Sequence, residues 1–122
     1  MLAWSSIAYG AALSAILAAV LVTLAVRPRK AAVVAMATIG AVVGPVAWNA
    51  ILHTVGGSEF FVDAPIAVFP VSWQDTGSGV FTLAAASLLL GFGPLRAESG
   101  RRVVVAAVLA AVAALVVDVY LY

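Results

Sequence analysis

The sequence predicts an all-α integral membrane protein, a four-helix bundle with an interfacial, partly irregular outer connection between its second and third helices. Of the 122 residues, 66% are hydrophobic and only 9% are charged, against roughly 45–50% apolar residues in soluble domains. A soluble chain of this length could not remove so much apolar surface from water. The apolar residues also form four long runs, as a bilayer core about 30 Å thick requires. We expect a single transmembrane domain over residues 1–122.

The four expected spans cover approximately residues 2–26, 31–55, 73–95 and 103–122. Each exceeds the ~17 residues that a membrane crossing needs. The basic segment RPRK at 27–30 ends the first span, and Gly56 and Gly57 end the second. The first span is not expected to be a cleavable signal peptide, because its positive charges follow it instead of preceding it.

The basic residues predict the orientation of these spans. All six Lys and Arg residues lie in the connections 27–30 and 96–102, and short loops rich in Lys and Arg stay cytoplasmic. Both termini and the connection 56–72 are therefore expected on the extracytoplasmic side of a multi-pass protein of the cell membrane. An aromatic belt near that outer interface agrees with this orientation; its members are Trp4, Trp73, Tyr120 and Tyr122.

This orientation can be tested with single cysteines, because the chain contains none of its own. A cysteine at Ser58 is expected to react with an impermeant thiol reagent in intact cells. A cysteine at Ser99 is expected to react only after lysis. The reverse labelling pattern would contradict the predicted orientation.

Small residues indicate where the helices pack. In lipid, helices associate by close backbone approach, which favours small residues four positions apart. The second span contains such a pair in Gly40 and Gly44. This face is expected either to pack within the bundle or to bind a second copy or a larger membrane-complex partner. Membrane lipid is the other expected partner. With a net charge of +1 and no basic face, a role in binding nucleic acid is not expected.

Polar residues gather in the outer half of the predicted bundle. Tyr9, Asn49, Thr82 and Asp118 come from four different spans and lie about 20–27 Å above the inner ends of their helices. His53 lies one turn above Asn49. We expect a polar pocket open to the extracytoplasmic side, with substrate-binding residues Tyr9, Asn49, His53, Trp73, Gln74 and Asp118.

Asp118 and His53 are the residues on which a chemical role for the polar pocket would depend. A carboxylate inside a membrane usually faces the bundle and finds a partner, although Asp118 is also near enough to the helix end to reach water. His53 with a carboxylate would form a general-base pair. The catalytic residue, if any, stays unknown, with candidates His53, Asp63, Asp75 and Asp118. A lone histidine is a weak indication of metal, so no metal site and no cofactor are expected.

The connection before the third span is predicted to be irregular and to end in a helix cap. Pro65 and Pro70 prevent a continuous helix, and the aromatic residues around them suggest a segment lying at the outer interface. Ser72-Trp-Gln-Asp75 is typical of a capping box that begins the third helix. This structural role for Asp75 is as well supported as a chemical one.

The sequence resembles known proteins in two respects. Asp75-Thr76-Gly77-Ser78 matches the D-T-G-S of aspartic proteases, but here it opens a membrane helix in a chain without a strand pattern. The length and the four apolar runs are similar to small multidrug transporters and fluoride channels. The first span lacks the membrane-embedded glutamate of those transporters, and no family is assigned.

Two classes of function remain. The first is a transporter or a supporting subunit of a membrane complex, favoured by the short chain and its few polar groups. The second is a small membrane enzyme that acts on a lipid or isoprenoid, using His53 and nearby carboxylates as acid and base.

Overall fold

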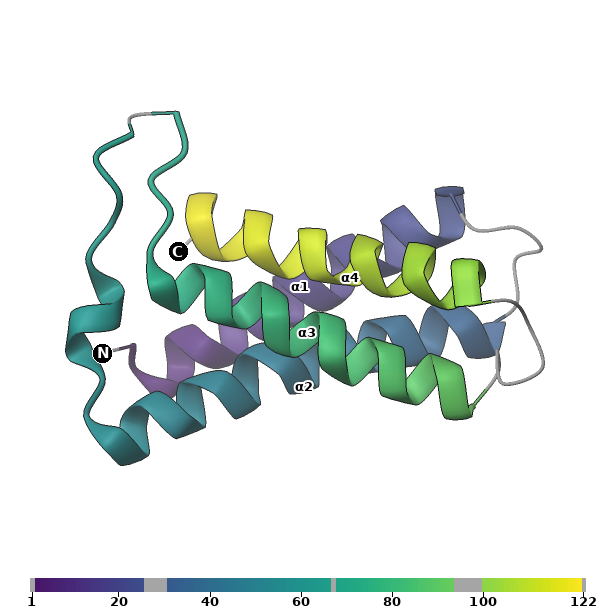
Figure 1. Cartoon of the computed structure of the whole chain (residues 1–122), viewed down its shortest axis with the longest axis horizontal. Helices are drawn as coiled ribbons and strands as arrows, with labels where there is room; N and C mark the ends of the chain where they lie inside the picture. Colours follow the sequence, from purple (N-terminus) through teal and green to yellow (C-terminus); the bar gives the residue numbers. More distant parts are fainter. Residues whose placement is uncertain (1, 26–30, 67, 94–99, 122) are drawn as a thin grey trace.

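A computed structural model describes residues 2–25, 31–66, 68–93 and 100–121. Within these ranges the chain forms four α-helices and one short 3-10 helix (Figure 1), in the order α1 (Trp4–Ala25), α2 (Ala31–Val55), η1 (Ser58–Phe61), α3 (Trp73–Phe92) and α4 (Gly100–Tyr120). The predicted all-α bundle is confirmed, and each α-helix is long and apolar enough to cross a membrane. The fourth helix begins at Gly100, about one turn before its predicted start. Residues 26, 94, 95 and 122 of the predicted spans lie outside the described residues.

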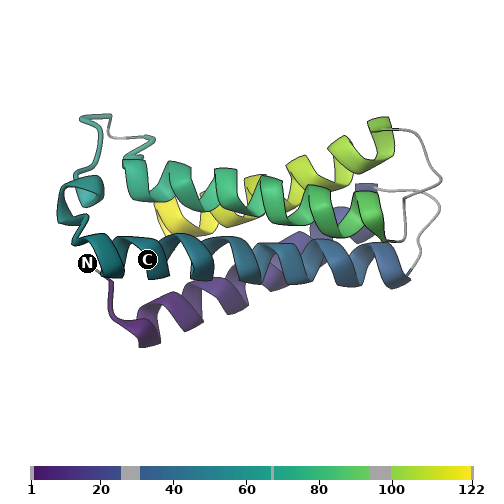
Figure 2. The ribbon, with the colours of Figure 1, turned by 60° about the horizontal axis from the view of Figure 1, so that its bottom comes forward.

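The four helices run alternately up and down. Helices α2 and α4 each pack against both α1 and α3, and they also meet each other across the centre of the bundle. Trp4, Val55, Trp73 and Tyr120 lie at one end, together with η1, and we call this the polar end (Figures 1 and 2). The described ends of the chain are therefore on the same side as the 56–72 connection, as the topology of four spans requires.

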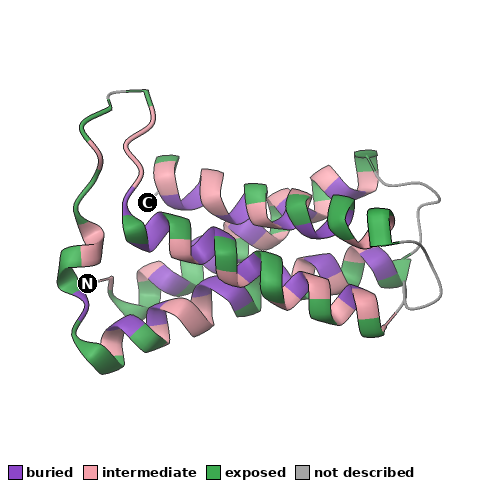
Figure 3. Cartoon of the chain, in the orientation of Figure 1, coloured by how far each residue is buried: buried purple, intermediate pink, exposed green. Residues whose placement is uncertain are grey.

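The bundle is apolar both inside and outside. Buried residues follow one another along the helices (Figure 3), and over much of the bundle they are small or aliphatic. Its outward face also carries large apolar side chains, including Ile16, Leu24 and Phe92, which are 62%, 64% and 82% exposed. Water would disfavour so much contiguous apolar surface, whereas lipid tails solvate it. Together with the four spanning helices, this surface makes the chain a multi-pass membrane protein.

The two glycines of α2 allow its backbone to approach α3. A Cβ atom at Gly44 would lie 2.4 Å from the Thr82 backbone nitrogen, and one at Gly40 would lie 2.9 Å from Ala86 Cα. No larger residue fits at either position without moving the helices apart. The Gly40/Gly44 face is thus occupied by α3 of the same chain, and binding of a partner remains a separate prediction.

The connection at the polar end is irregular, as predicted. Gly56, with φ of +67°, ends α2, and a single 3-10 turn follows. The two legs of the connection are joined where Ala64 N donates to Val71 O at 2.7 Å. The Tyr120 hydroxyl donates to the Val68 carbonyl and so ties the tip of the connection to α4.

The start of α3 shows the predicted capping box. Ser72 Oγ accepts a hydrogen bond from Asp75 N at 3.2 Å, and Asp75 Oδ2 accepts one from Ser72 N at 2.9 Å. These two bonds satisfy backbone donors that a helix start leaves without partners. They fix the direction in which the first turn of α3 presents Gln74.

Candidate functional site

Gln74 is the centre of a buried polar cluster near the polar end. The side chain is only 3% exposed and projects from the first turn of α3. Its Nε2 atom lies 3.2 Å from Asn49 Oδ1 on α2 and 3.3 Å from Asp118 Oδ2 on α4. Ser78 Oγ, one turn along α3, lies 3.4 Å from the same nitrogen. One amide group therefore joins three helices, and we call these four residues the Gln74 cluster.

The donors and acceptors of the Gln74 cluster are unequal in number. A glutamine amide has two N–H hydrogens, yet three oxygen atoms surround Nε2. Either one N–H hydrogen of Gln74 is shared between two of the oxygens, or the two hydrogens alternate among the three oxygens. Asn49 Nδ2 donates to Pro45 O at 2.9 Å, and its Oδ1 is the atom that accepts from Gln74. Gln74 Nε2 is the donor in all three of the bonds that join the cluster.

Trp48 holds Gln74 from the backbone side. The Trp48 indole nitrogen donates to the Gln74 carbonyl at 2.9 Å. Its ring fits over Gly77, where an added Cβ would come within 2.1 Å of the indole. The α2–α3 contact thus positions Gln74 through both packing and a hydrogen bond.

A small polar pocket of about 200 Å³ lies beside the Gln74 cluster. Three of the candidate carboxylates border it, and its lining includes Asp63, Ser72, Gln74, Asp75 and Asp118. Asp118 is 2% exposed, so its side chain faces the bundle and not the lipid. Asp75 already serves the capping box. The pocket therefore brings together carboxylates from the connection, α3 and α4. Two of them also stabilise the fold, because Asp75 caps α3 and Asp118 accepts a hydrogen bond from Gln74.

His53 occupies a different place. Its Nε2 atom lies 2.7 Å from the Leu2 carbonyl oxygen, and because a carbonyl only accepts, Nε2 is the protonated nitrogen. The ring stacks on Trp4, with ring centres 4.8 Å apart and planes inclined by 21°. His53 does not line the polar pocket. It joins the segment before α1 to the end of α2.

Two other expected site residues point away from the cluster. Tyr9 is 57% exposed and Trp73 is 70% exposed, so both are on the outer surface of the bundle. Thr82 is buried against Gly44, and within the described residues its hydroxyl oxygen has no hydrogen-bond partner. Of the four residues expected in one layer, the structure joins Asn49 and Asp118 through Gln74.

The bridging role of Gln74 and the participation of Ser78 were not foreseen. The available signal was the four-residue spacing of Gln74 and Ser78, which puts both side chains on one helix face. Asn49 and Asp118 were recognised, but the sequence does not indicate which donor lies between them. Asp63, Asp75 and Asp118 border one pocket, but among the described residues no three His, Asp or Glu side chains form a group that could hold one metal ion.

Comparison with known proteins gives no family assignment. No protein-family model, curated protein or solved structure matches this chain.

Proposed function

We propose that the protein is a non-enzymatic supporting subunit of a larger membrane complex, with its polar end on the extracytoplasmic side. The observation that carries this proposal is the closed apolar core below the Gln74 cluster. Its members are Ala18, Val22, Val33, Ala37, Ala41, Ala86, Leu90, Ala106, Ala107, Ala110 and Ala113, each at most 2% exposed.

A path for a polar solute needs polar groups or a water-filled pore along the bundle axis. The core cluster is apolar, and its small side chains let the helices pack closely. Outside the Gln74 cluster and the capping box, the buried polar side chains of the described residues are Ser14 and Thr82, which are two isolated hydroxyl groups. The polar pocket therefore ends at the Gln74 cluster, and one copy of the chain is better suited to packing than to conduction.

The polar groups are also largely engaged in structural contacts. Gln74 joins three helices, Asp75 caps α3, and His53 binds the Leu2 carbonyl. A general-base pair requires histidine and carboxylate within hydrogen-bond reach, and His53 instead contacts a backbone carbonyl and Trp4. This arrangement supports the subunit over the enzyme, and leaves the outward apolar faces as the surface through which the chain would act.

Native purification after cross-linking in intact membranes tests the proposal. The tagged chain, expressed at its natural level, is expected to migrate as a discrete complex with a stoichiometric protein partner. Tryptophan substitutions at one exposed position per helix should locate the docking face. We choose Ala12→Trp, Ala35→Trp, Ala84→Trp and Val105→Trp, because all four positions are exposed.

One of these substitutions is expected to remove the partner, while the other three retain it and serve as matched controls. A chain that stays free of partner protein before and after cross-linking would contradict the proposal. Solute flux through liposomes that contain only this chain would favour the transporter. Turnover of an added lipid by the purified chain would favour the enzyme.

A further inference from the structure

We propose that the outer surface of α3 and α4 binds one membrane lipid whose head group carries an ammonium. The site consists of two adjoining cavities. The upper one, of about 300 Å³, lies between the two legs of the connection and the start of α3. The lower one, of about 230 Å³, is a groove between α3 and α4. Thr76 lines both cavities, so they adjoin at the start of α3, and one lipid would place its head group in the upper cavity and a tail in the lower one.

The lower groove suits a hydrocarbon chain. Apart from Thr76 its lining is wholly apolar, and α3 and α4 each contribute residues at spacings of three, four and seven. Gly79 forms part of the wall, and a Cβ there would make only ordinary contacts, 3.5 Å from Leu115 Cβ. An α-helix is about 10–12 Å across with its side chains and would cover this groove from outside. A single acyl chain is narrow enough to enter it.

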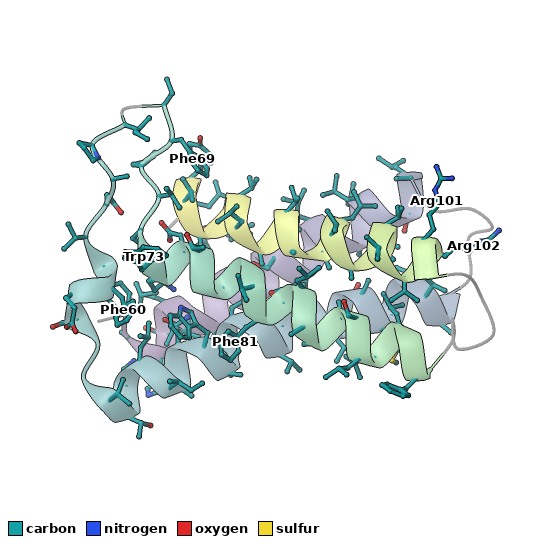
Figure 4. The ribbon with its side chains drawn as sticks, in the orientation of Figure 1. Phe60, Phe69, Trp73, Phe81, Arg101 and Arg102 are labelled. Carbon is teal, nitrogen blue, oxygen red and sulfur yellow. The ribbon has the colours of Figure 1, made fainter. Side chains whose placement is uncertain are left out.

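The upper cavity suits a cationic head group. Asp63 lines it, and no Lys or Arg occurs between residues 31 and 95, so no basic side chain of α2, α3 or their connection neutralises this carboxylate. The Trp73 ring lines the same cavity and is 70% exposed, which allows a cation–π contact with an ammonium. Figure 4 shows Trp73 at the polar end, far from Arg101 and Arg102 at the opposite end.

The charge decides which lipid is selected. Lipid tails around the protein are as apolar as the groove, so transfer of a tail into it contributes little selectivity. An ammonium beside Asp63 gains a favourable ion pair, whereas an uncharged or anionic terminal group does not. The binding site should therefore distinguish lipids by head group when their tails are identical.

Native mass spectrometry of the full-length protein, delipidated in mild detergent, tests this proposal. Phosphatidylethanolamine and phosphatidylglycerol with the same tails are the probes. We expect a one-to-one adduct with both, and about two- to fivefold tighter binding of phosphatidylethanolamine, the range of an exposed ion pair. Asp63→Asn should remove that preference. Glu59→Gln, which changes an exposed carboxylate outside both cavities, should keep it.

The groove is tested separately by filling it. Val112→Trp and Val80→Trp change walls contributed by α4 and α3 and should each lose the adduct with both lipids. Val43→Trp is the matched control, because Val43 is 46% exposed and Val112 is 44% exposed, but Val43 lies outside the groove. Thermal unfolding of each variant checks that the bundle is folded.

Equal binding of the two lipids, or a preference unchanged by Asp63→Asn, would overturn the ammonium assignment. Adducts retained in folded Val80→Trp and Val112→Trp proteins would overturn the groove assignment. Absence of any adduct from the parent protein would overturn both. None of these outcomes depends on whether a protein partner is found, so the lipid site and the supporting subunit are tested independently.

Discussion

Replacing Gly44 with leucine is expected to prevent the normal packing of α2 on α3. An added Cβ at this position would lie 2.4 Å from the Thr82 nitrogen and 2.5 Å from Thr82 Cα. Because these are backbone atoms, a rotamer change cannot relieve the clash and the helices must separate. Overpacked cores lose typically 1–3 kcal/mol, and we expect about 3 kcal/mol or more here. Thermal unfolding and size-exclusion chromatography in one detergent would measure the loss.

Two other substitutions in α2 serve as references for the loss of stability expected from Gly44→Leu. Val43→Leu changes an outward side chain that is 46% exposed, and should remain within about 0.5 kcal/mol of the parent. The loss of stability for Gly40→Ala should lie between those for Val43→Leu and Gly44→Leu, because the added Cβ would meet Ala86 Cα at 2.9 Å. If Gly44→Leu unfolds at the parent temperature, the described α2–α3 contact is wrong.

Replacing Gln74 with leucine is expected to destabilise the polar end of the bundle. Leucine keeps an apolar body of similar length but supplies no hydrogen to the oxygens of Asn49, Ser78 and Asp118. A buried polar group left without its partner costs roughly 1–3 kcal/mol, and more when charged. We therefore expect a loss of about 3 kcal/mol in denaturation monitored by tryptophan fluorescence.

A double-mutant cycle separates this bond from general packing. Asp118→Asn retains an oxygen that can accept from Gln74 and should cost less than about 1 kcal/mol. Gln74→Leu with Asp118→Leu should be less damaging than the sum of the two single changes, since each removes a partner that the other needs. Strict additivity would show that the two side chains do not interact. Asp63→Asn, at an exposed position, is the control for loss of a carboxylate.

These variants also distinguish a structural cluster from a working site. If the Gln74 cluster only holds helices together, Asp118→Asn should assemble with the proposed partner as the parent does. If the carboxylate performs chemistry or transport, Asp118→Asn should fold normally and lose activity. The second outcome would contradict the supporting-subunit proposal.

Several parts of the candidate site followed from residue type and spacing. Of the two alternatives for Asp118, facing the bundle or reaching water at the helix end, the structure shows the first, because Asp118 is 2% exposed. The S-x-x-D pattern identified the capping box at Ser72 and Asp75. Both inferences rest on local chemistry, because the cost of a charge in lipid and the unpaired N–H groups of a helix start are the same in any fold.

The placement of the side chains differs from the expected polar layer where the rotation of a helix about its axis matters. The sequence predicts that Tyr9 lies in the same polar layer as Asn49. This prediction rests on the rise per residue of a helix, which gives the height of a residue along the axis but not the direction of its side chain. Its direction depends on which face of α1 meets α2 and α4, and that face carries Ile7, Ser14 and Ala18 instead. Tyr9 is therefore 57% exposed. The sequence likewise predicts His53 near the carboxylates, whereas in the structure His53 contacts the Leu2 carbonyl and the Trp4 ring.

The sequence by itself determined the membrane class, the four helices, and that Gly40 and Gly44 allow close helix contact, because apolar length and side-chain size act locally and in every fold. Only the structure shows that the helix packed against these glycines is α3 of the same chain. Only the tertiary structure decided that Gln74 bridges Asn49 and Asp118, since these residues are separated by 25 and 44 positions from it. It also decided that Thr76 lines both a cavity at the connection and a groove between α3 and α4. Such relations depend on the rotation of each helix about its axis and on how closely the helices approach. Because the faces of these helices are almost uniformly apolar, the packing of small side chains determines that rotation.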